Sequence, residues 1–303
     1  MATVGTPSLD QLQVLIAVVD EGSFAAAGRR LNRATSAISY TISALEAQLG
    51  LALFDRGNPR RPSLTQAGQT VLAKARGVTS DIDDLKARVA GMRAGLEAEL
   101  TLVVDVMLPS QRLVDAVQAF EAQFPTVTLR LNMEALSAVS QLVQRGMATL
   151  GIGGALHTAE VGLETVAVGD VLMIPVARPD HPLAGSEAGV VGAARRHRQL
   201  ILTVRTAFQQ GGDVNVFAPQ TWPLADLGAK HTLLLAGMGW GYMPQPVVRD
   251  DIAAGRLIHL DLPEMPSGAY PLQAMYRTDA PPGPAGAWFI QRLVAQAAPS
   301  LPL

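Results

Sequence analysis

The chain has 303 residues, of which 49% are hydrophobic and 17% charged, and its formal net charge is -2. This balance fits a globular protein of two or three domains and excludes a disordered chain. The absence of cysteine excludes disulfides and thiolate zinc sites. The start carries no secretory signal, and no apolar run approaches the ~18 residues that a membrane span needs. We therefore expect a cytoplasmic protein with no membrane contact, on which any nucleic-acid surface is local.

Three short helices are predicted near the amino terminus. Apolar residues recur at helical spacing over residues 9–19, and Ser23 is a good N-cap for a second helix that ends near Leu31. A third helix over residues 35–49 has one apolar stripe and, opposite it, a face of small hydroxyls and one tyrosine. Two short helices that meet at a tight turn are typical of a helix-turn-helix. The alternative is an ordinary helical pair with a solvated face.

The candidate DNA-binding side chains lie on this third helix, around the turn and in the loop that follows. Arginines suit the phosphate backbone, and hydroxyls suit base edges or phosphates. Residues 53–54 and 64–65 could pair as short strands around an arginine-rich tip, which would form a wing; a solvated basic loop is the alternative. The candidates are Ser23, Arg29, Arg30, Arg33, Thr35, Ser36, Ser39, Tyr40, Thr41, Arg56, Arg60 and Arg61.

A long helix with a heptad seam comes next. A narrow apolar seam on a helix that is tied to a small domain indicates self-association, with packing on its own chain as the alternative. Gly91 and Gly95 mark the frayed end of this helix. The seam residues, separated alternately by four and three positions, are Val71, Ala75, Val78, Ile82, Leu85, Val89, Met92 and Leu96.

Strands and helices alternate from about residue 100 onward. Such repeated units imply open, mostly parallel α/β sheets with ligand crevices at the carboxyl ends of the strands, and two units joined by strands would form a clamshell. Strands are predicted at 100–106, 127–133, 150–152, 171–177, 200–204, 214–217, 241–243, 257–260 and 270–277, and helices at about 113–124, 137–145, 224–237, 246–255 and 287–298.

Taken together, the chain resembles the LysR-type transcriptional regulators over essentially its full length. Spacing, chain order and the long helix that follows all agree with that family. The residues that carry the resemblance are 9–24, Ala27, Leu31, 36–39, Ile42, 45–46, 49–50, 53–54, Arg56 and 64–68, followed by His181-Pro182-Leu183 and the glycine-rich segment 237–244.

The resemblance implies an α/β multidomain protein in three parts. These would be a winged helix-turn-helix over residues 1–66, a dimerising linker helix over 67–97, and an effector-binding domain like a periplasmic binding protein over 98–303. The last part would consist of subdomain 1, about 98–168 and 269–303, and subdomain 2, about 169–268. The implied function is sequence-specific regulation of transcription. The implied partners are double-stranded promoter DNA, a small-molecule effector, RNA polymerase and further copies of the chain, as a homodimer through the linker helix and as a homotetramer.

The predicted recognition helix departs from the family pattern. The family often has Ser-Gln-Pro near the start of this helix and a basic residue after the serine. Here the matching positions are Ala34, Thr35 and Ser36 and, after Ser39, Tyr40. Thr35 and Tyr40 can bond a base or a phosphate, but neither reproduces the bidentate readout of Gln or Arg. The operator sequence therefore stays open.

The family's effector contacts come from the first strand-to-helix turn, the next loops of subdomain 1 and facing loops of subdomain 2. Asp105 has two interpretations: a carboxylate tied to backbone N–H groups of the 108–110 turn, or a group that receives a cationic or hydrogen-bond-donating effector. The candidates mapped in this way are Asp105, Met107, Leu108, Pro109, Ser110, Leu136, Ser137, Ala155, Leu156, Thr203, Thr206, Trp222 and Met238.

An enzyme, or a cytosolic solute-binding protein with a helical interaction domain, is the rival interpretation. The glycine runs at 151–154 and 237–241 do not have the strand-glycine-helix order of a dinucleotide site. No motif of a metalloprotease or a serine hydrolase occurs. We therefore expect no catalytic residues, no cofactor and no metal. The histidines are scattered without metal-ligand spacing, so we expect surface or satisfied side chains. They are His157, His181, His197, His231 and His259.

Overall fold

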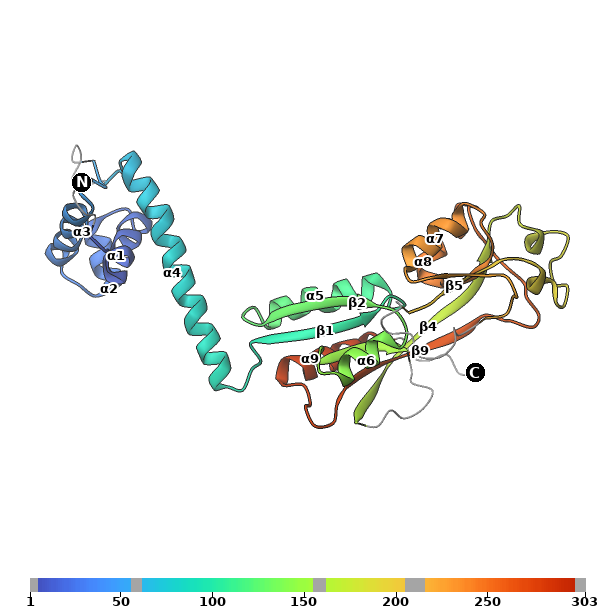
Figure 1. The fold of residues 1–303 in the computed structure, drawn as a ribbon. Coiled ribbons are helices and arrows are strands. Elements are labelled where there is room, and N and C mark those ends of the chain that lie inside the picture. Colours follow the sequence, from blue (N-terminus) through green and yellow to red (C-terminus); the bar gives the residue numbers. More distant parts are fainter. Residues whose placement is uncertain (1–4, 56–61, 155–161, 205–215, 298–303) are drawn as a thin grey trace. The chain divides into compact units, whose positions relative to one another are not determined.

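The computed structural model describes residues 5–55, 62–154, 162–204 and 216–297. It divides into two compact units, Met1–Ala90 and Gly91–Leu303, which are described separately here. The first unit is helical, and the second combines helices with a long, twisted sheet (Figure 1). No helix of the described residues is long and apolar enough to cross a membrane.

The first unit begins with three short helices, as predicted: α1 (Leu9–Asp20), α2 (Phe24–Leu31) and α3 (Thr35–Leu49). Ser8 caps α1 in a capping box with Gln11, and the Ser23 hydroxyl accepts a hydrogen bond from the Ala26 N–H at the start of α2. Their apolar stripes meet in one core, in which Leu15, Ile38 and other residues are fully buried. The periodicity of the sequence therefore identified the buried faces correctly.

The turn between α2 and α3 depends on Asn32, for its backbone conformation, and on Gly28, for its lack of a side chain. Asn32 ends α2 in the left-handed region with φ 54°, which asparagine tolerates well. The Arg33 N–H donates to the Gly28 carbonyl at 2.8 Å. A Cβ atom at Gly28 would lie only 2.7 Å from the Arg33 carbonyl oxygen, so a larger residue would push the two helices apart.

The two predicted strands of the wing meet in an isolated antiparallel bridge between Phe54 and Leu64. Glu46 reinforces the bridge, because its Oε1 accepts from the Leu53 and Phe54 N–H groups at 2.7 and 3.1 Å. Thr65 continues it and then caps the next helix through Gly68. The tip, with Arg56, Arg60 and Arg61, lies outside the described residues.

The long helix α4 (Gln66–Arg93) carries the heptad seam. Its first turns pack on the helical core through Leu72 and Ala75. Further along, the seam residues Val78, Leu85 and Val89 are exposed, with 59% of Leu85 accessible to solvent. The helix ends where Gly91 and Gly95 were expected to weaken it, and Gly95 has a φ of 79°.

The second unit contains a mixed sheet whose strand order is β2-β1-β3-β9-β4-β7, with β8 also paired to β4. β1 is parallel to β2 and β3, whereas β9 is antiparallel to both β3 and β4. A separate sheet pairs β5 with β6 in parallel. The strands are β1 (Glu99–Asp105), β2 (Thr128–Glu134), β3 (Leu150–Gly154), β4 (Leu163–Ala177), β5 (Gln199–Leu202), β6 (Thr221–Leu224), β7 (Gly241–Pro244), β8 (Ile258–His259) and β9 (Gly268–Arg277).

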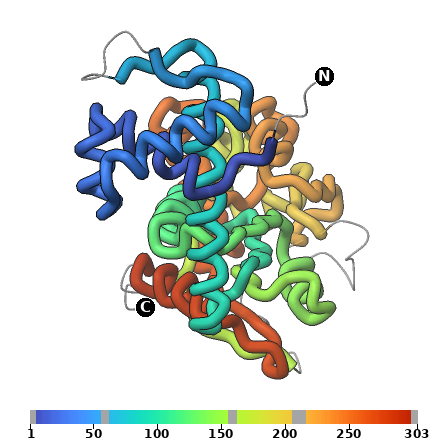
Figure 2. The backbone as a smooth tube through the Cα atoms, turned by 90° about the vertical axis from the view of Figure 1, so that its left-hand side faces the viewer, coloured from blue at the N-terminus to red at the C-terminus, as the bar shows by residue number. Residues whose placement is uncertain are grey.

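Helices cover these sheets. Figure 2 shows α5 and α9 side by side, and the rings of Phe120 and Phe289 meet edge to face at 5.8 Å between their centroids. This contact belongs to the larger apolar core of the unit. The helices are α5 (Ser110–Gln123), α6 (Ala138–Gln144), α7 (Leu227–Leu235), α8 (Gln245–Ala253) and α9 (Pro284–Gln296), with 3-10 turns at Pro182–Ala184 and Ala193–Arg196.

The long strands β4 and β9 connect two hydrophobic cores (Figure 1). The first half of β4 contributes Val168 to the core under α5 and α9, and its second half contributes Ile174 to another core with Leu200 and Leu202 of β5. Between these halves the pairing with β9 shifts at Gly169, whose φ is 102°. The unit is thus built from two α/β bodies joined by continuous strands.

One strand prediction was too short and another was wrong in position. The strand expected at 171–177 begins already at Leu163, because β9 offers a partner along its whole length. The strand expected at 214–217 is absent at its described residues 216–217. The N–H groups of Phe217 and Ala218 donate instead to the Gln199 side chain, and β6 forms later, at Thr221–Leu224.

Candidate nucleic-acid interface and effector-binding region

The candidate recognition face on α3 is open to solvent. Thr35, Ser36, Ser39 and Tyr40 are all exposed, and Tyr40 is 76% accessible. Thr41 is different: it is half-buried, and its hydroxyl donates to the Ala37 carbonyl at 2.9 Å. Thr41 therefore bonds its own helix, whereas the other four side chains stand on the exposed side.

The amino terminus of α3 lacks a side-chain cap. Ala34 occupies the cap position and provides no oxygen, whereas serines cap α1 and α2. N–H groups in the first turn of a helix that have no cap suit a phosphate. Beside this terminus lies an open depression of about 450 Å³, lined by Ala25, Gly28, Arg29, Asn32, Arg33, Ala34 and Thr35.

Two of the candidate arginines form ion pairs with carboxylates that the sequence analysis did not connect to them. Arg33 holds Asp10 of α1 at 2.7 Å, and this contact keeps the pKa of the Asp10 carboxyl below its usual value. Arg30 lies 3.1 Å from Glu21. Arg29 is exposed beside the depression. The positive charge at the turn is therefore partly balanced from within the same unit.

In the second unit, Asp105 ends β1 and is completely buried. Its Oδ1 accepts a hydrogen bond from the Met107 N–H at 3.0 Å, and its Oδ2 accepts one from the Tyr270 hydroxyl at 2.8 Å. The backbone N–H groups of Leu136 and Gly154 also stabilise the carboxylate. Burial is the larger effect and raises the pKa of Asp105 to about 6, while these hydrogen bonds act in the opposite direction.

This geometry favours the structural interpretation of Asp105 over direct contact with a cationic effector, because both oxygens already accept bonds from the chain. The donor is the Met107 N–H, one residue before the 108–110 turn that was expected to provide it. The contribution of Tyr270 was missed. It lies 165 positions further along the chain, and no local pattern links it to Asp105.

The other subdomain 1 candidates line the ends of the same strands. Met107 and Leu108 are buried, while Ser110 and Ser137 are exposed at the starts of α5 and α6. Met107 joins the core that contains Leu200 and Leu202, so the loop after β1 contacts the second α/β body. Ala155 and Leu156 lie outside the described residues, as does Thr206.

The candidates from subdomain 2 fall into two places. The Thr203 N–H, just beyond the carboxyl end of β5, donates to the Leu224 carbonyl at 2.9 Å. Trp222 and Met238 instead gather around Arg198. The Arg198 guanidinium carbon stands 4.0 Å from the centre of the Trp222 ring, and its Nη1 donates to the Met238 carbonyl at 3.4 Å. Arg198 precedes β5, so this pair lies toward the amino end of that strand, away from Thr203.

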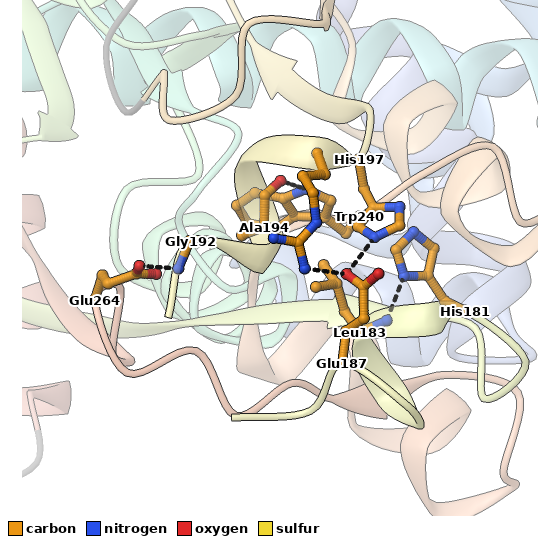
Figure 3. Close-up of polar contacts among 9 residues, drawn as sticks. His181, Leu183, Glu187, Gly192, Ala194, His197, Trp240 and Glu264 are labelled. Atoms are coloured by element: carbon orange, nitrogen blue, oxygen red, sulfur yellow. Dashed lines mark hydrogen bonds and ion pairs between the residues drawn. The ribbon is translucent and has the colours of Figure 1, made fainter. Parts of the chain in front are cut away.

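The described histidines are partnered, as expected of surface or satisfied side chains. The His181 and His197 rings meet edge to face at 5.0 Å (Figure 3). His181 Nδ1 accepts from the Leu183 N–H, and His197 Nε2 lies 2.8 Å from Glu187. His231 lies 2.7 Å from Asp251, and His259 bonds Ser267. His157 is outside the described residues. Among the residues that the structure describes, no group of three or more His, Asp or Glu side chains could hold a metal ion.

A buried lysine was also missed by the sequence analysis. Lys230 of α7 is almost completely buried, and its Nζ donates to the Tyr242 carbonyl of β7 at 2.8 Å. Burial lowers the pKa of Lys230 to about 7. In the sequence it looks like any polar helix residue, and only the packing of α7 against β5 and β7 buries it.

Comparison with known proteins places this architecture in a family. The model of the bacterial regulatory helix-turn-helix protein, lysR family, matches residues 9–69, and that of the LysR substrate binding domain matches residues 93–298. The probable HTH-type transcriptional regulator YhaJ of Escherichia coli is 30% identical over 271 residues, which cover 85% of this chain and 87% of YhaJ.

Solved structures share the fold. Full-length LysG from Corynebacterium glutamicum with bound effector Arg has a TM-score of 0.50 and 22% identity, covering 95% of this chain and 97% of LysG. A mutant OxyR from the same organism has a TM-score of 0.51 and 18% identity, covering 96% and 93% of the two chains. With both domains matched in order, the chain belongs to the LysR family of transcriptional regulators.

Proposed function

We propose that this chain binds promoter DNA in a sequence-specific manner through α3 and that a small-molecule effector modulates the contact. One observation carries the DNA-binding half: an exposed face with Thr35, Ser36, Ser39 and Tyr40 adjoins a helix terminus without a side-chain cap. Hydroxyls on such a face can bond base edges, while the terminus and Arg29 can bond phosphates. Ser23 and Thr41 would support this face rather than touch DNA.

We propose the functional division 1–66, 67–97 and 98–303, with subdomains at about 98–168 plus 269–303 and at about 169–268. The effector would bind between the two α/β bodies, where the loops after β1 and β2 approach the second core. Met107 and Ala135 support this placement, since each belongs to one of these loops and is packed among residues of that core.

The linker helix would form a homodimer, from which a homotetramer is assembled. Exposed Val78, Leu85, Val89 and Met92 continue the seam beyond the part that packs on the helical unit. An apolar heptad seam in water is stabilised when a second helix covers it. We further propose that the protein acts in the cytoplasm, contacts RNA polymerase, and has no catalytic activity, metal or cofactor of its own.

Titration on two DNA duplexes tests the proposal. The wild-type chain should bind the region upstream of its own gene more tightly than a scrambled duplex of equal length and composition. Tyr40→Ala should reduce this preference by ~1–3 kcal/mol if Tyr40 reads a base edge. Ser43→Ala, an exposed change one turn further along α3, serves as the control. Equal binding of both duplexes by the wild-type chain would contradict the proposed sequence-specific regulation.

A further inference from the structure

The carboxylate of Asp105 is held from three separate segments at one edge of the sheet. Met107 follows β1, Leu136 follows β2 and Gly154 ends β3, and each provides a backbone N–H to the carboxylate. Asp251, the other buried carboxylate of the described residues, is instead bound by the side chains of His231 and Arg256. The half-buried Glu97 accepts from the neighbouring N–H groups of residues 285 and 286, which belong to one segment at the start of α9. Convergence from three strand ends distinguishes the Asp105 position.

The surrounding backbone is shaped for this convergence. Leu136 has a φ of 53°, a conformation that a leucine rarely adopts. Gly154 has no Cβ, and one placed there would overlap the Tyr270 hydroxyl oxygen. Only glycine therefore lets Tyr270 reach Asp105 as the fourth donor. Backbone N–H groups that point to one spot form an anion-binding concavity, and the carboxyl ends of parallel strands are where open α/β sheets bind ligands.

We propose that the ends of β1, β2 and β3 form a carboxylate-binding cradle, that Asp105 fills it as an internal ligand, and that the effector meets this edge with an uncharged group. The last statement rests on the proposed effector-dependent function, whereas the cradle itself does not. In this arrangement the chain provides its own anion at a place where a free carboxylate would otherwise bind.

The occupied cradle selects against charged effector groups of either sign. A second carboxylate would find the N–H groups already bonded and would be repelled by Asp105. A cation would have to reach a completely buried side chain whose two oxygens already accept hydrogen bonds. The loop residues beside it, Met107 and Ala135, are buried and apolar, which leaves an uncharged group as the fitting partner.

Vacating the cradle by Asp105→Ala in the full-length chain tests the proposal by chemical rescue. The variant should melt several degrees below the wild-type protein. Sodium formate should raise its melting temperature by several degrees more than sodium chloride does at equal ionic strength. Acetate, which is larger, should act more weakly. The wild-type protein and Asp105→Asn, in which a side chain still fills the cradle, should respond equally to formate and chloride.

Leu102→Ala is the matched control, because Leu102 is a fully buried residue of the same strand whose loss creates an apolar space without freeing the N–H groups. Its melting temperature should be lower but equal in the two salts. An equal rise in melting temperature with formate in Leu102→Ala and Asp105→Ala would overturn the proposal of a carboxylate-binding cradle. If Asp105→Ala shows no thermal transition, its refolding yield from urea decides: more folded protein in formate supports the cradle, and equal yields overturn it.

The formate experiment tests the cradle independently of the proposed function. The formate response involves no DNA, so a chain without sequence-specific binding would still show it and would lose only the statement about the effector. A formate-specific rise in the melting temperature of the wild-type protein would show instead that an anion is accepted beside Asp105. That outcome would overturn the uncharged-group assignment.

Discussion

The hydroxyl of Tyr270 donates a hydrogen bond of 2.8 Å to Oδ2 of Asp105, joining the end of β1 to β9 across 165 positions of sequence. Tyr270→Phe removes this donor and leaves a buried carboxylate oxygen with one bond fewer. We expect the free energy of unfolding to fall by ~1–3 kcal/mol, as for other buried polar groups that lose a partner. Urea unfolding of the full chain measures it. Tyr276→Phe, on the same strand, should cost much less, and equal losses would contradict the importance of the Asp105 bond.

The buried Asp105 predicts a pH dependence of stability. Burial raises its pKa from 3.8 to about 6, so between these pH values the native protein binds more protons at this group than the unfolded chain. Its contribution to stability is therefore complete below about pH 4 and is lost as the pH rises through about 6. The full effect is on the order of 3 kcal/mol. Asp105→Asn removes it, and the difference in stability between wild type and variant should change over this range. A constant difference would mean that Asp105 keeps its ordinary pKa.

The buried Lys230 predicts that the free energy of unfolding also depends on pH in the alkaline range. Burial lowers its pKa from 10.5 to about 7, so between these values the unfolded chain binds more protons than the native protein. The free energy of unfolding should therefore rise with pH from about 7 toward 10.5, and this contribution is lost as the pH falls through about 7. Lys230→Met should flatten the curve, whereas Lys74→Met, at an exposed position of α4, should leave it unchanged. Denaturant titrations at several pH values provide the measurement.

The Arg33–Asp10 pair predicts that an acidic residue restrains DNA binding. Asp10→Asn frees the guanidinium for a phosphate, so affinity should rise by about twofold to tenfold on both specific and scrambled DNA, with a steeper dependence on salt. The increase should vanish in the double variant with Arg33→Ala. Fluorescence anisotropy over a salt series measures both quantities. An unchanged salt slope would indicate that Arg33 does not contact the backbone.

The exposed seam of α4 predicts self-association. Leu85→Asp places a charge where the partner helix would pack, so the oligomer should dissociate while the fold of each unit is retained. Operator affinity should fall with it, because two recognition helices would no longer be held together. Arg88→Asp, also exposed on α4 but outside the seam, is the control. Sedimentation velocity decides the question, and an unchanged oligomer in Leu85→Asp would mean that the subunits associate through another surface.

The amino-terminal half of the first unit could be derived from the sequence because its determinants are local. Ser23 caps α2 by accepting from the N–H of Ala26, three residues away, and Ile38 belongs to a stripe that repeats at helical spacing within one helix. The seam of α4 follows the same rule. Each of these features depends on residues a few positions apart, so the pattern of the chain is sufficient to locate them. The LysR family resemblance rests largely on this part.

Only the tertiary structure decided the features that depend on distant partners. Nothing near Asp105 indicates that Tyr270 bonds it, and nothing near Arg33 indicates that Asp10 neutralises it. The burial of Lys230 and the early start of β4 likewise depend on other segments that pack beside them. Local propensity describes one stretch of chain at a time, whereas burial, pKa and strand length depend on which segments the fold brings together.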